Sequence, residues 1–161
     1  MSDASPPDAP PPDAPPPDPQ EWASRRRETA AAHADRLARI RAQETARARE
    51  MVRAFADEAR RRGVGTRPLL ARAGDGKPTY RTGLQGWYLA RDGSLGVTPD
   101  GEYYTLVSPV SLRSRLFGVT LQPAEPPLQV GAGARDGESI ALDALLALRL
   151  DAGNDWTVQG L

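Results

Sequence analysis

The side chains that most often carry catalysis are scarce in this chain. It has no Cys and a single His, His33. Without Cys there are no disulfides, thiolate nucleophiles or thiolate metal ligands. A nucleophilic Ser needs a base within hydrogen-bond reach, and His33 lies in a segment predicted to be helical, away from the Ser-bearing turns. We therefore assign no catalytic, cofactor-binding or metal-binding residue, and we expect a protein that is not an enzyme and needs no cofactor.

Carboxylates are the one class of reactive side chain that remains in number. Of the ten acidic residues in the C-terminal part of the chain, five are candidates for such chemistry: Asp92, Asp100, Glu102, Asp136 and Glu138. Two paired carboxylates can act as general acid and general base. Most of these five, however, occupy positions where turns already favour Asp or a neighbouring Gly. A small enzyme that uses carboxylates is therefore the third interpretation of function.

A glycine-rich stretch, Gly131 to Gly137, has the composition of a phosphate-binding loop. A dinucleotide fingerprint needs G-x-G-x-x-G between a strand and a helix, and here the third Gly comes one position late. A P-loop needs Gly-Lys followed by Ser or Thr, whereas this chain has Gly137-Glu138-Ser139. We interpret the stretch as a flexible connection.

Charge is unevenly distributed along the chain, although the net charge is zero. Residues 1–18 carry four Asp and no basic residue, within the repeat S-P-P-D-A, P-P-P-D-A, P-P-P-D. Pro lacks an amide donor and favours extended polyproline II backbone, which builds no core. We expect a disordered acidic spacer. There are two alternatives: residues 1–18 dock to a proline-recognition domain, or they fold back onto the Arg-rich segment that follows.

Residues 19–62 are predicted to form one long helix. Asp18 is a good N-cap, Pro19 suits the first helical position, and no Gly or Pro follows until Gly63. Strong helix formers dominate the segment, and three consecutive Arg precede Gly63, as is typical of a helix C-terminus. At about 1.5 Å per residue this helix is about 66 Å long, roughly twice the diameter of a domain of about 100 residues.

An apolar stripe runs along this helix in steps of three and four residues. Its members are Leu37, Ile40, Ala48, Met51, Phe55 and Ala59, and several lie 11 residues apart, as in an eleven-residue coiled-coil repeat. We expect the C-terminal half, with Met51 and Phe55, to pack on the module that follows. The N-terminal half then has nothing in the chain to cover it, and an isolated Ala-rich helix is only marginally stable. It should pair with a second copy or another protein; a lone solvated helix and a bent helix are the alternatives.

The same helix is rich in arginine. Residues 21–62 carry 12 Arg against seven acidic residues, which is enough positive charge to attract phosphate. The acids are interleaved with the Arg, and aromatic residues are nearly absent, so an ion-paired solvated surface is the preferred interpretation. His33 lies on the side of Leu37 and Ile40, where we expect it to pack. Nucleic-acid binding is the second interpretation of function.

Residues 63–161 change to a two-residue alternation and predict a small α+β module. Strands at 84–91, 95–98 and 102–107, joined by turns at 92–94 and 99–101, predict an antiparallel meander. Shorter strands are expected at 69–72, 79–81, 116–121 and 128–130, and a helix at 144–152 between Asp143 as cap and Gly153 as stop. Trp156 is expected to close the core.

Two aromatic pairs, Trp87-Tyr88 and Tyr103-Tyr104, fall on neighbouring strands of this meander. Adjacent residues on a strand point to opposite faces, so one member of each pair faces the core. If the other face is open, Trp87 and Tyr103 mark an aromatic binding patch. If a helix covers that face, they are core residues, and both alternatives stay open at this point.

These patterns predict an α+β protein in three parts: an acidic tail (1–18), a long helix (19–62) and a small module (63–161). Its expected role is non-catalytic, as a protein-interaction or assembly subunit whose partner is itself or another protein. The expected contacts are Leu37, Ile40, Met51 and Phe55 on the helix, and Trp87 and Tyr103 on the module. Of the 21 basic residues, 20 are Arg, which indicates a GC-rich bacterial genome. With no signal-peptide pattern and no apolar run of about 20 residues, we expect a cytoplasmic protein with no membrane partner.

Overall fold

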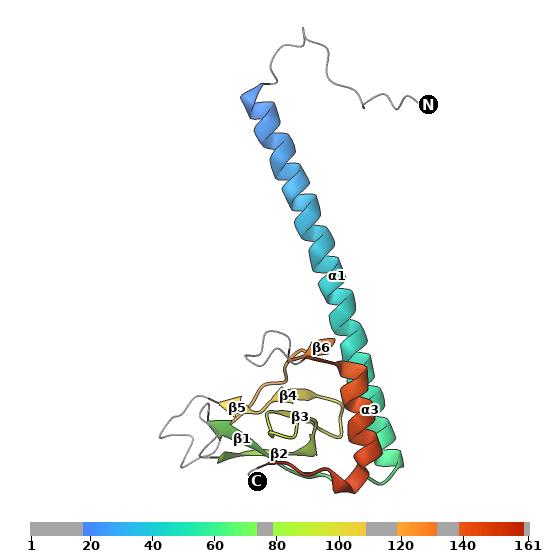
Figure 1. The fold of residues 1–161 in the computed structure, drawn as a ribbon. Coiled ribbons are helices and arrows are strands. Elements are labelled where there is room, and N and C mark those ends of the chain that lie inside the picture. The colour runs from blue at the N-terminus through green and yellow to red at the C-terminus, as the bar shows by residue number, and fades with distance from the viewer. Residues whose placement is uncertain (1–17, 74–78, 109–118, 132–138, 160–161) are drawn as a thin grey trace, which may run out of the picture. The chain divides into compact units, whose positions relative to one another are not determined.

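The computed structural model describes residues 18–73, 79–108, 119–131 and 139–159 (Figure 1). The chain divides into two compact units, Met1–Ile40 and Arg41–Leu161. The long helix α1, Pro19–Arg61, contributes to both units. The division therefore falls within the helix and not at its end, because the second half of α1 is part of the core of the second unit. Of the expected acidic tail, only Asp18 is among the described residues.

Both ends of α1 follow from the sequence. A carboxylate oxygen of Asp18 accepts a hydrogen bond of 2.9 Å from the amide of Gln20, as expected for an N-cap. At the other end Gly63 has a φ of 68°. Its amide donates to the carbonyl of Arg60 at 3.0 Å, and the amide of Val64 donates to Ala59 at 2.9 Å. This pair of bonds is the Schellman motif, which explains why Gly63 ends the helix.

A five-stranded sheet with the order β4-β3-β2-β1-β5 forms the centre of the second unit. The strands are β1 (Arg67–Ala73), β2 (Thr79–Tyr88), β3 (Leu95–Val97), β4 (Tyr103–Thr105) and β5 (Val107–Ser108). The successive strands β2, β3 and β4 are antiparallel, which confirms the predicted meander. Strand β5 pairs with β1 in parallel. A separate pair, β6 (Gln129–Val130) and β7 (Ile140–Ala141), includes the short strand expected at 128–130.

Some strand bounds differ from those expected. The strands predicted at 79–81 and 84–91 form one strand, β2. The two residues between them, Thr82 and Gly83, form a β-bulge, where the pairing with β1 shifts register between Leu69 and Leu70. Gly83 has a φ of 75°, a conformation in which side chains with a Cβ are strained. Residues 119–121 form no strand, and the rest of the strand predicted at 116–121 lies outside the described residues.

The second helix of the module is α3, Leu142–Ala152, and Gly153 ends it as predicted. It begins two residues before the expected start, with Ala141 as N-cap, so that Asp143 lies inside the first turn. Leu142 is fully buried in the core, which favours the earlier start. Asp143 still complements the positive end of the helix dipole. The short 3₁₀ turn η1, Gly153–Asp155, follows.

Apolar side chains cover both faces of the sheet. On one face, Val52 and Phe55 of α1 and Leu145 of α3 pack with Trp87 and Tyr103. In Figure 1 these two helices lie side by side against the sheet. On the other face, the C-terminal segment packs on the sheet through Trp156 and Val158, in a cluster that also contains Leu69, Tyr88, Tyr104 and Leu106. Trp156 is 6% exposed, so it closes the core as predicted.

Candidate interaction surface

The structure places the six predicted contact residues in different environments. Leu37 and Ile40 are 41% and 44% exposed. Met51 is half-buried against the core, and Phe55 is buried in it, with its ring edge-to-face with Trp87 at 5.7 Å between centroids. Trp87 and Tyr103 are only 1% and 5% exposed. Trp87 and Tyr103 are therefore core residues and not a binding patch, because α1 and α3 cover that face of the sheet. Phe55 is corrected as a partner contact too, because it packs on the module, as expected for the second half of α1.

Asp92, one of the five carboxylates singled out from the sequence, lies in a turn. One carboxylate oxygen of Asp92 accepts hydrogen bonds from the amide and hydroxyl of Ser94, at 2.9 and 2.7 Å, as turn chemistry predicts. It lies at an open hollow of about 1020 Å³ next to Tyr103. Burial raises the pKa of Tyr103 to about 12, so its hydroxyl stays protonated at neutral pH. In the described part of the chain, no three His, Asp or Glu side chains form a group that could hold a metal ion. Asp136, Glu138 and most of the Gly131–Gly137 stretch lie outside that part.

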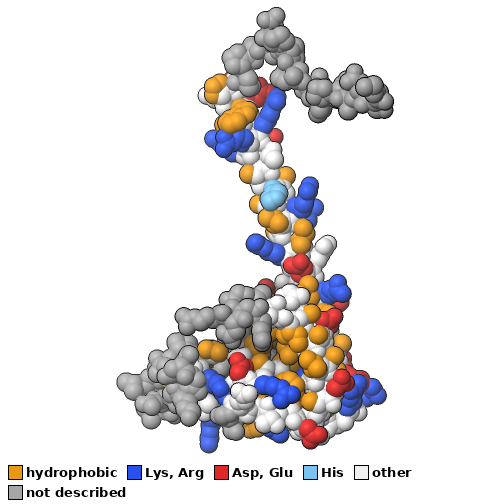
Figure 2. Space-filling view, in the orientation of Figure 1, with side chains coloured by type: hydrophobic (Ala, Val, Ile, Leu, Met, Phe, Trp, Pro, Cys, Tyr) orange, Lys and Arg blue, Asp and Glu red, His pale blue; other side chains and the backbone are white. Residues whose placement is uncertain are grey.

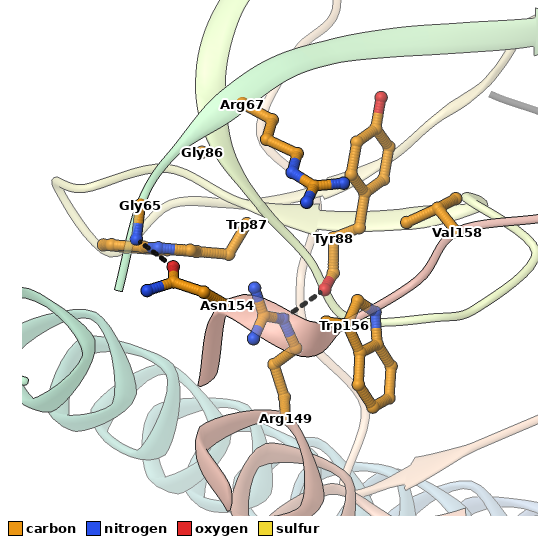
Figure 3. Close-up of a pocket in the computed structure, with 9 residues that line it drawn as sticks. All are labelled: Gly65, Arg67, Gly86, Trp87, Tyr88, Arg149, Asn154, Trp156 and Val158. Carbon is orange, nitrogen blue, oxygen red and sulfur yellow. Dashed lines mark hydrogen bonds between the residues drawn. The ribbon is translucent and has the colours of Figure 1, made fainter. Parts of the chain in front are cut away.

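A smaller cavity lies beside Arg149, a buried arginine of α3 (Figure 3). The Arg149 guanidinium donates to the carbonyl of Tyr88 at 2.9 Å and to that of Gly153 at 2.6 Å. Burial, with a contribution from Arg67, lowers the pKa of Arg149 to about 10, so the group is still charged at neutral pH. The cavity measures about 10 Å³, which is room for about one water molecule. It is too small for a ligand, and Arg149 instead ties α3 to strand β2.

Arginines also hold the C-terminal segment in place. The guanidinium carbons of Arg91 and Arg149 lie 4.6 and 5.4 Å from the ring centroid of Trp156, within cation–π range. The Arg72 side chain donates to the backbone carbonyl of Gln159. The backbone amide of Gln159 donates to the backbone carbonyl of Arg91 at 2.7 Å. These arginines therefore have structural roles that the sequence reasoning missed. The signal was Arg149 itself, which follows Leu145 and Leu146 at the spacing of a buried helix face.

The first half of α1 carries the largest exposed apolar side chains of that helix. At about 100° per residue, an apolar stripe of Trp22, Ala30, His33, Ala34, Leu37 and Ile40 falls on one side of the helix. We call this stripe the 22–40 face. Trp22, which is 52% exposed, lies five turns before Ile40 on the same line, at about 3.6 residues per turn. In Figure 2, apolar side chains lie around the pale-blue His33 along this half of the helix. The structure thus adds Trp22 to the predicted contacts Leu37 and Ile40.

The charges around the 22–40 face are sorted by sign. The acids Glu21, Glu28 and Asp35 are spaced by seven residues and follow one line on the opposite side of the helix. Arg26 lies on the face itself, with its guanidinium carbon 4.5 Å from the centroid of the Trp22 ring. By the same helical geometry, Arg27 and Arg36 border the face on its two sides. Among the described residues, none of these three arginines forms an ion pair. The face therefore combines exposed apolar groups with a basic rim.

Comparison with protein-family models, with curated proteins and with solved structures finds no match to this chain. Within the described residues, no helix combines the length and the apolar character that crossing a membrane requires.

Proposed function

We propose that the protein is a non-catalytic interaction subunit that docks to another protein through the 22–40 face of helix α1. The observation that carries this proposal is the exposure of Trp22, Leu37 and Ile40, which are 52%, 41% and 44% exposed on one side of one helix. Large apolar side chains aligned in this way are typical anchors for a helix that lies in an apolar groove or pairs with a second helix.

Apolar burial supplies only part of the binding free energy. Full burial of one such side chain contributes about 1.5–3 kcal/mol. About half of each is still exposed, so the three together offer about 3 kcal/mol. Micromolar binding requires about 8 kcal/mol. The partner must therefore also engage Arg26, Arg27 and Arg36, and this favours a partner with acidic side chains around its own apolar surface.

The charges around the 22–40 face favour a different protein over a second copy of this chain as the partner. Two copies paired through the 22–40 face would bring arginine rims together, because the acids Glu21, Glu28 and Asp35 lie on the opposite side. Like charges across an interface oppose pairing and select against that partner. Of the two partners expected from the sequence, the proposal therefore takes another protein in preference to the chain itself.

The test compares two sets of substitutions in the full chain. Trp22→Ala, Leu37→Ala and Ile40→Ala together remove the apolar part of the face. Val107→Ala and Leu148→Ala are the matched control, because these side chains are 47% and 54% exposed outside the face. The proteins are purified under mild conditions from cells that naturally make the chain, and co-purifying proteins are quantified. We expect one partner to be lost with the first set and kept with the second. Equal recovery of all partners with both sets would contradict the proposal.

Nucleic-acid binding is the second candidate, and one observation favours it. Arg26 and Arg27 lie beside an exposed aromatic ring, Trp22, and aromatic stacking beside basic groups is typical of single-strand binding. Leu37 and Ile40 have no role in that chemistry, which is why it ranks second. Retention of the full chain on a polyanion column at about 0.15 M salt, lost in Arg26→Gln with Arg36→Gln, would favour it over the protein partner.

A further inference from the structure

The 22–40 face has the chemistry to bind an acidic, proline-rich segment. Its exposed ring, Trp22, is the kind of surface against which prolines pack, and PPII segments are recognised on aromatic surfaces of this kind. Its three arginines, Arg26, Arg27 and Arg36, have no ion pair among the described residues. An occupant that places carboxylates beside these arginines and prolines beside Trp22 would satisfy both features.

The chain itself contains a segment of this composition. Residues 1–17 hold eight Pro, the three acids Asp3, Asp8 and Asp13, and no basic residue. This segment joins the helix at Asp18, immediately before the 22–40 face. We infer that the 22–40 face binds residues 1–17 of the same chain, with Asp side chains of the segment paired to the arginines of the face. The inference rests on the proposed function, since it names an occupant that a partner protein would have to displace.

The spacing of the charges agrees on the two sides. In an extended segment with about 3.1 Å per residue, the five-residue repeat places successive Asp about 16 Å apart. Along α1, at about 1.5 Å per residue, Arg26 and Arg36 lie about 15 Å apart. Two successive Asp can therefore meet both arginines at once. The 17 residues span about 53 Å when extended, and residues 19–40 of the helix span about 33 Å, so the segment can reach the whole face.

The contact is weak for each ion pair but favoured by the covalent link. An exposed ion pair strengthens binding by only about 1.4- to 5-fold. Because the two parts belong to one chain, the effective concentration is of millimolar order, so a contact with a dissociation constant of about 1 mM is about half occupied. Two ion pairs supply at most about 30-fold of the roughly 1,000-fold that this constant requires, so the contact of the prolines with Trp22 has to supply the rest. Exposed charges are screened by salt, with a Debye length of about 10 Å at 0.1 M and about 3 Å at 1 M. The segment should therefore leave the face when the salt concentration is raised.

Trp22 reports on this contact directly. The other two tryptophans, Trp87 and Trp156, are 1% and 6% exposed, so quenching of fluorescence by acrylamide acts mainly on Trp22. The full chain is compared with a variant that carries Asp3→Asn, Asp8→Asn and Asp13→Asn, which keeps every proline and the chain length. A Trp22→Phe variant identifies the part of the signal that belongs to Trp22.

At about 0.02 M salt we expect the quenching constant of Trp22 to be about twofold higher in the Asn variant than in the unsubstituted chain. At about 0.5 M salt we expect the two quenching constants to be equal. Equal quenching at low salt would overturn the inference. A difference that grows with protein concentration between about 1 and 100 μM would also overturn it, because the segment would then come from a second copy. The co-purification test above is independent of this measurement. A partner lost with the Trp22, Leu37 and Ile40 substitutions, together with equal quenching, would leave the proposed function standing and remove only the inference.

Discussion

Replacing Phe55 by Ala tests the assignment of the second half of α1 to the core of the module. Phe55 is 3% exposed and makes an edge-to-face contact with Trp87, at an interplanar angle of 88°. The matched control is Leu37→Ala. Leu37 lies on the same line of the same helix, five turns earlier at about 3.6 residues per turn, but it is 41% exposed. The two substitutions therefore differ in burial and not in their position around the helix.

The expected effects differ several-fold. Truncation of a buried Phe to Ala typically costs about 3–5 kcal/mol, through lost burial and the cavity that remains. That range already covers the ring contact with Trp87, which would contribute about 0.5–1.5 kcal/mol. Exposed positions such as Leu37 usually change stability by no more than about 0.5 kcal/mol. Since a domain of this size has a total stability of about 5–15 kcal/mol, Phe55→Ala removes a large part of it.

The assay is urea unfolding of the full chain, followed by tryptophan fluorescence. Trp87 and Trp156 are buried in the module and change environment when it unfolds, whereas Trp22 is already 52% exposed in the folded chain. We expect the free energy of unfolding to fall by about 4 kcal/mol for Phe55→Ala and by less than about 0.5 kcal/mol for Leu37→Ala. Equal small effects for both substitutions would refute the packing of α1 into the module.

Three further predictions concern the interior of the module. Gly86→Ala should lower the free energy of unfolding by at least about 1–3 kcal/mol, because a Cβ there would lie 2.1 Å from the carbonyl oxygen of Val97. Gly65→Ala is the control, because its Cβ would meet nothing closer than 3.4 Å. Thermal melts of the two variants check this prediction. Because burial raises the pKa of Tyr103 to about 12, its neutral form stabilises the fold fully below pH 10, and that contribution is lost as the pH rises toward 12. The fall in the urea midpoint across this window should therefore be smaller in Tyr103→Phe than in the unsubstituted chain, and an unchanged pH dependence would contradict the burial of its hydroxyl. Arg149→Met should lower the free energy of unfolding by about 1–3 kcal/mol, since it leaves the buried carbonyl of Tyr88 without its donor; a neutral effect in a urea titration would show that this bond is not needed to hold α3.

The helix and its ends could be predicted from the sequence because their causes are local. Asp18 and Gly63 act through the backbone within a few residues, and no Gly or Pro interrupts the segment between Pro19 and Arg61. The division of the chain could not be predicted in the same way. Leu37 and Phe55 lie on one side of the helix, and periodicity alone does not say which part of that side another element covers. The boundary within the helix follows from long-range packing of the sheet on Ala48 to Ala59.

The aromatic pairs show the same limit. The alternation along β2 and β4 correctly assigns Trp87 and Tyr103 to one face of the sheet and Tyr88 and Tyr104 to the other. What the alternation could not show is that both faces are covered. The helices cover one face of the sheet, and the C-terminal segment with Trp156 covers the other. Arg91 and Arg149 hold Trp156 there by cation–π contacts. The contact of Arg91 with Trp156 joins residues 65 positions apart, and no short-range pattern records it.

The exposed part of the candidate surface was easier to identify. Leu37 and Ile40 stand out in a segment of Ala and charged residues, so the sequence already indicates an apolar stripe. Trp22 is harder to identify from periodicity, because it stands 15 residues before Leu37, with no large apolar side chain between them. On the continuous helix Pro19–Arg61, Trp22 and Ile40 fall on one line, because the step of 18 residues from one to the other makes about five turns.

The most direct test of the docking surface is site-specific photo-cross-linking in cells that naturally make the protein. A photoreactive side chain is placed at Leu37, on the 22–40 face, or at Ala32, about 140° around the helix at 100° per residue. The proposal predicts a discrete adduct with another protein from position 37 and none from position 32. Adducts of equal yield from both positions, or from neither, would contradict it.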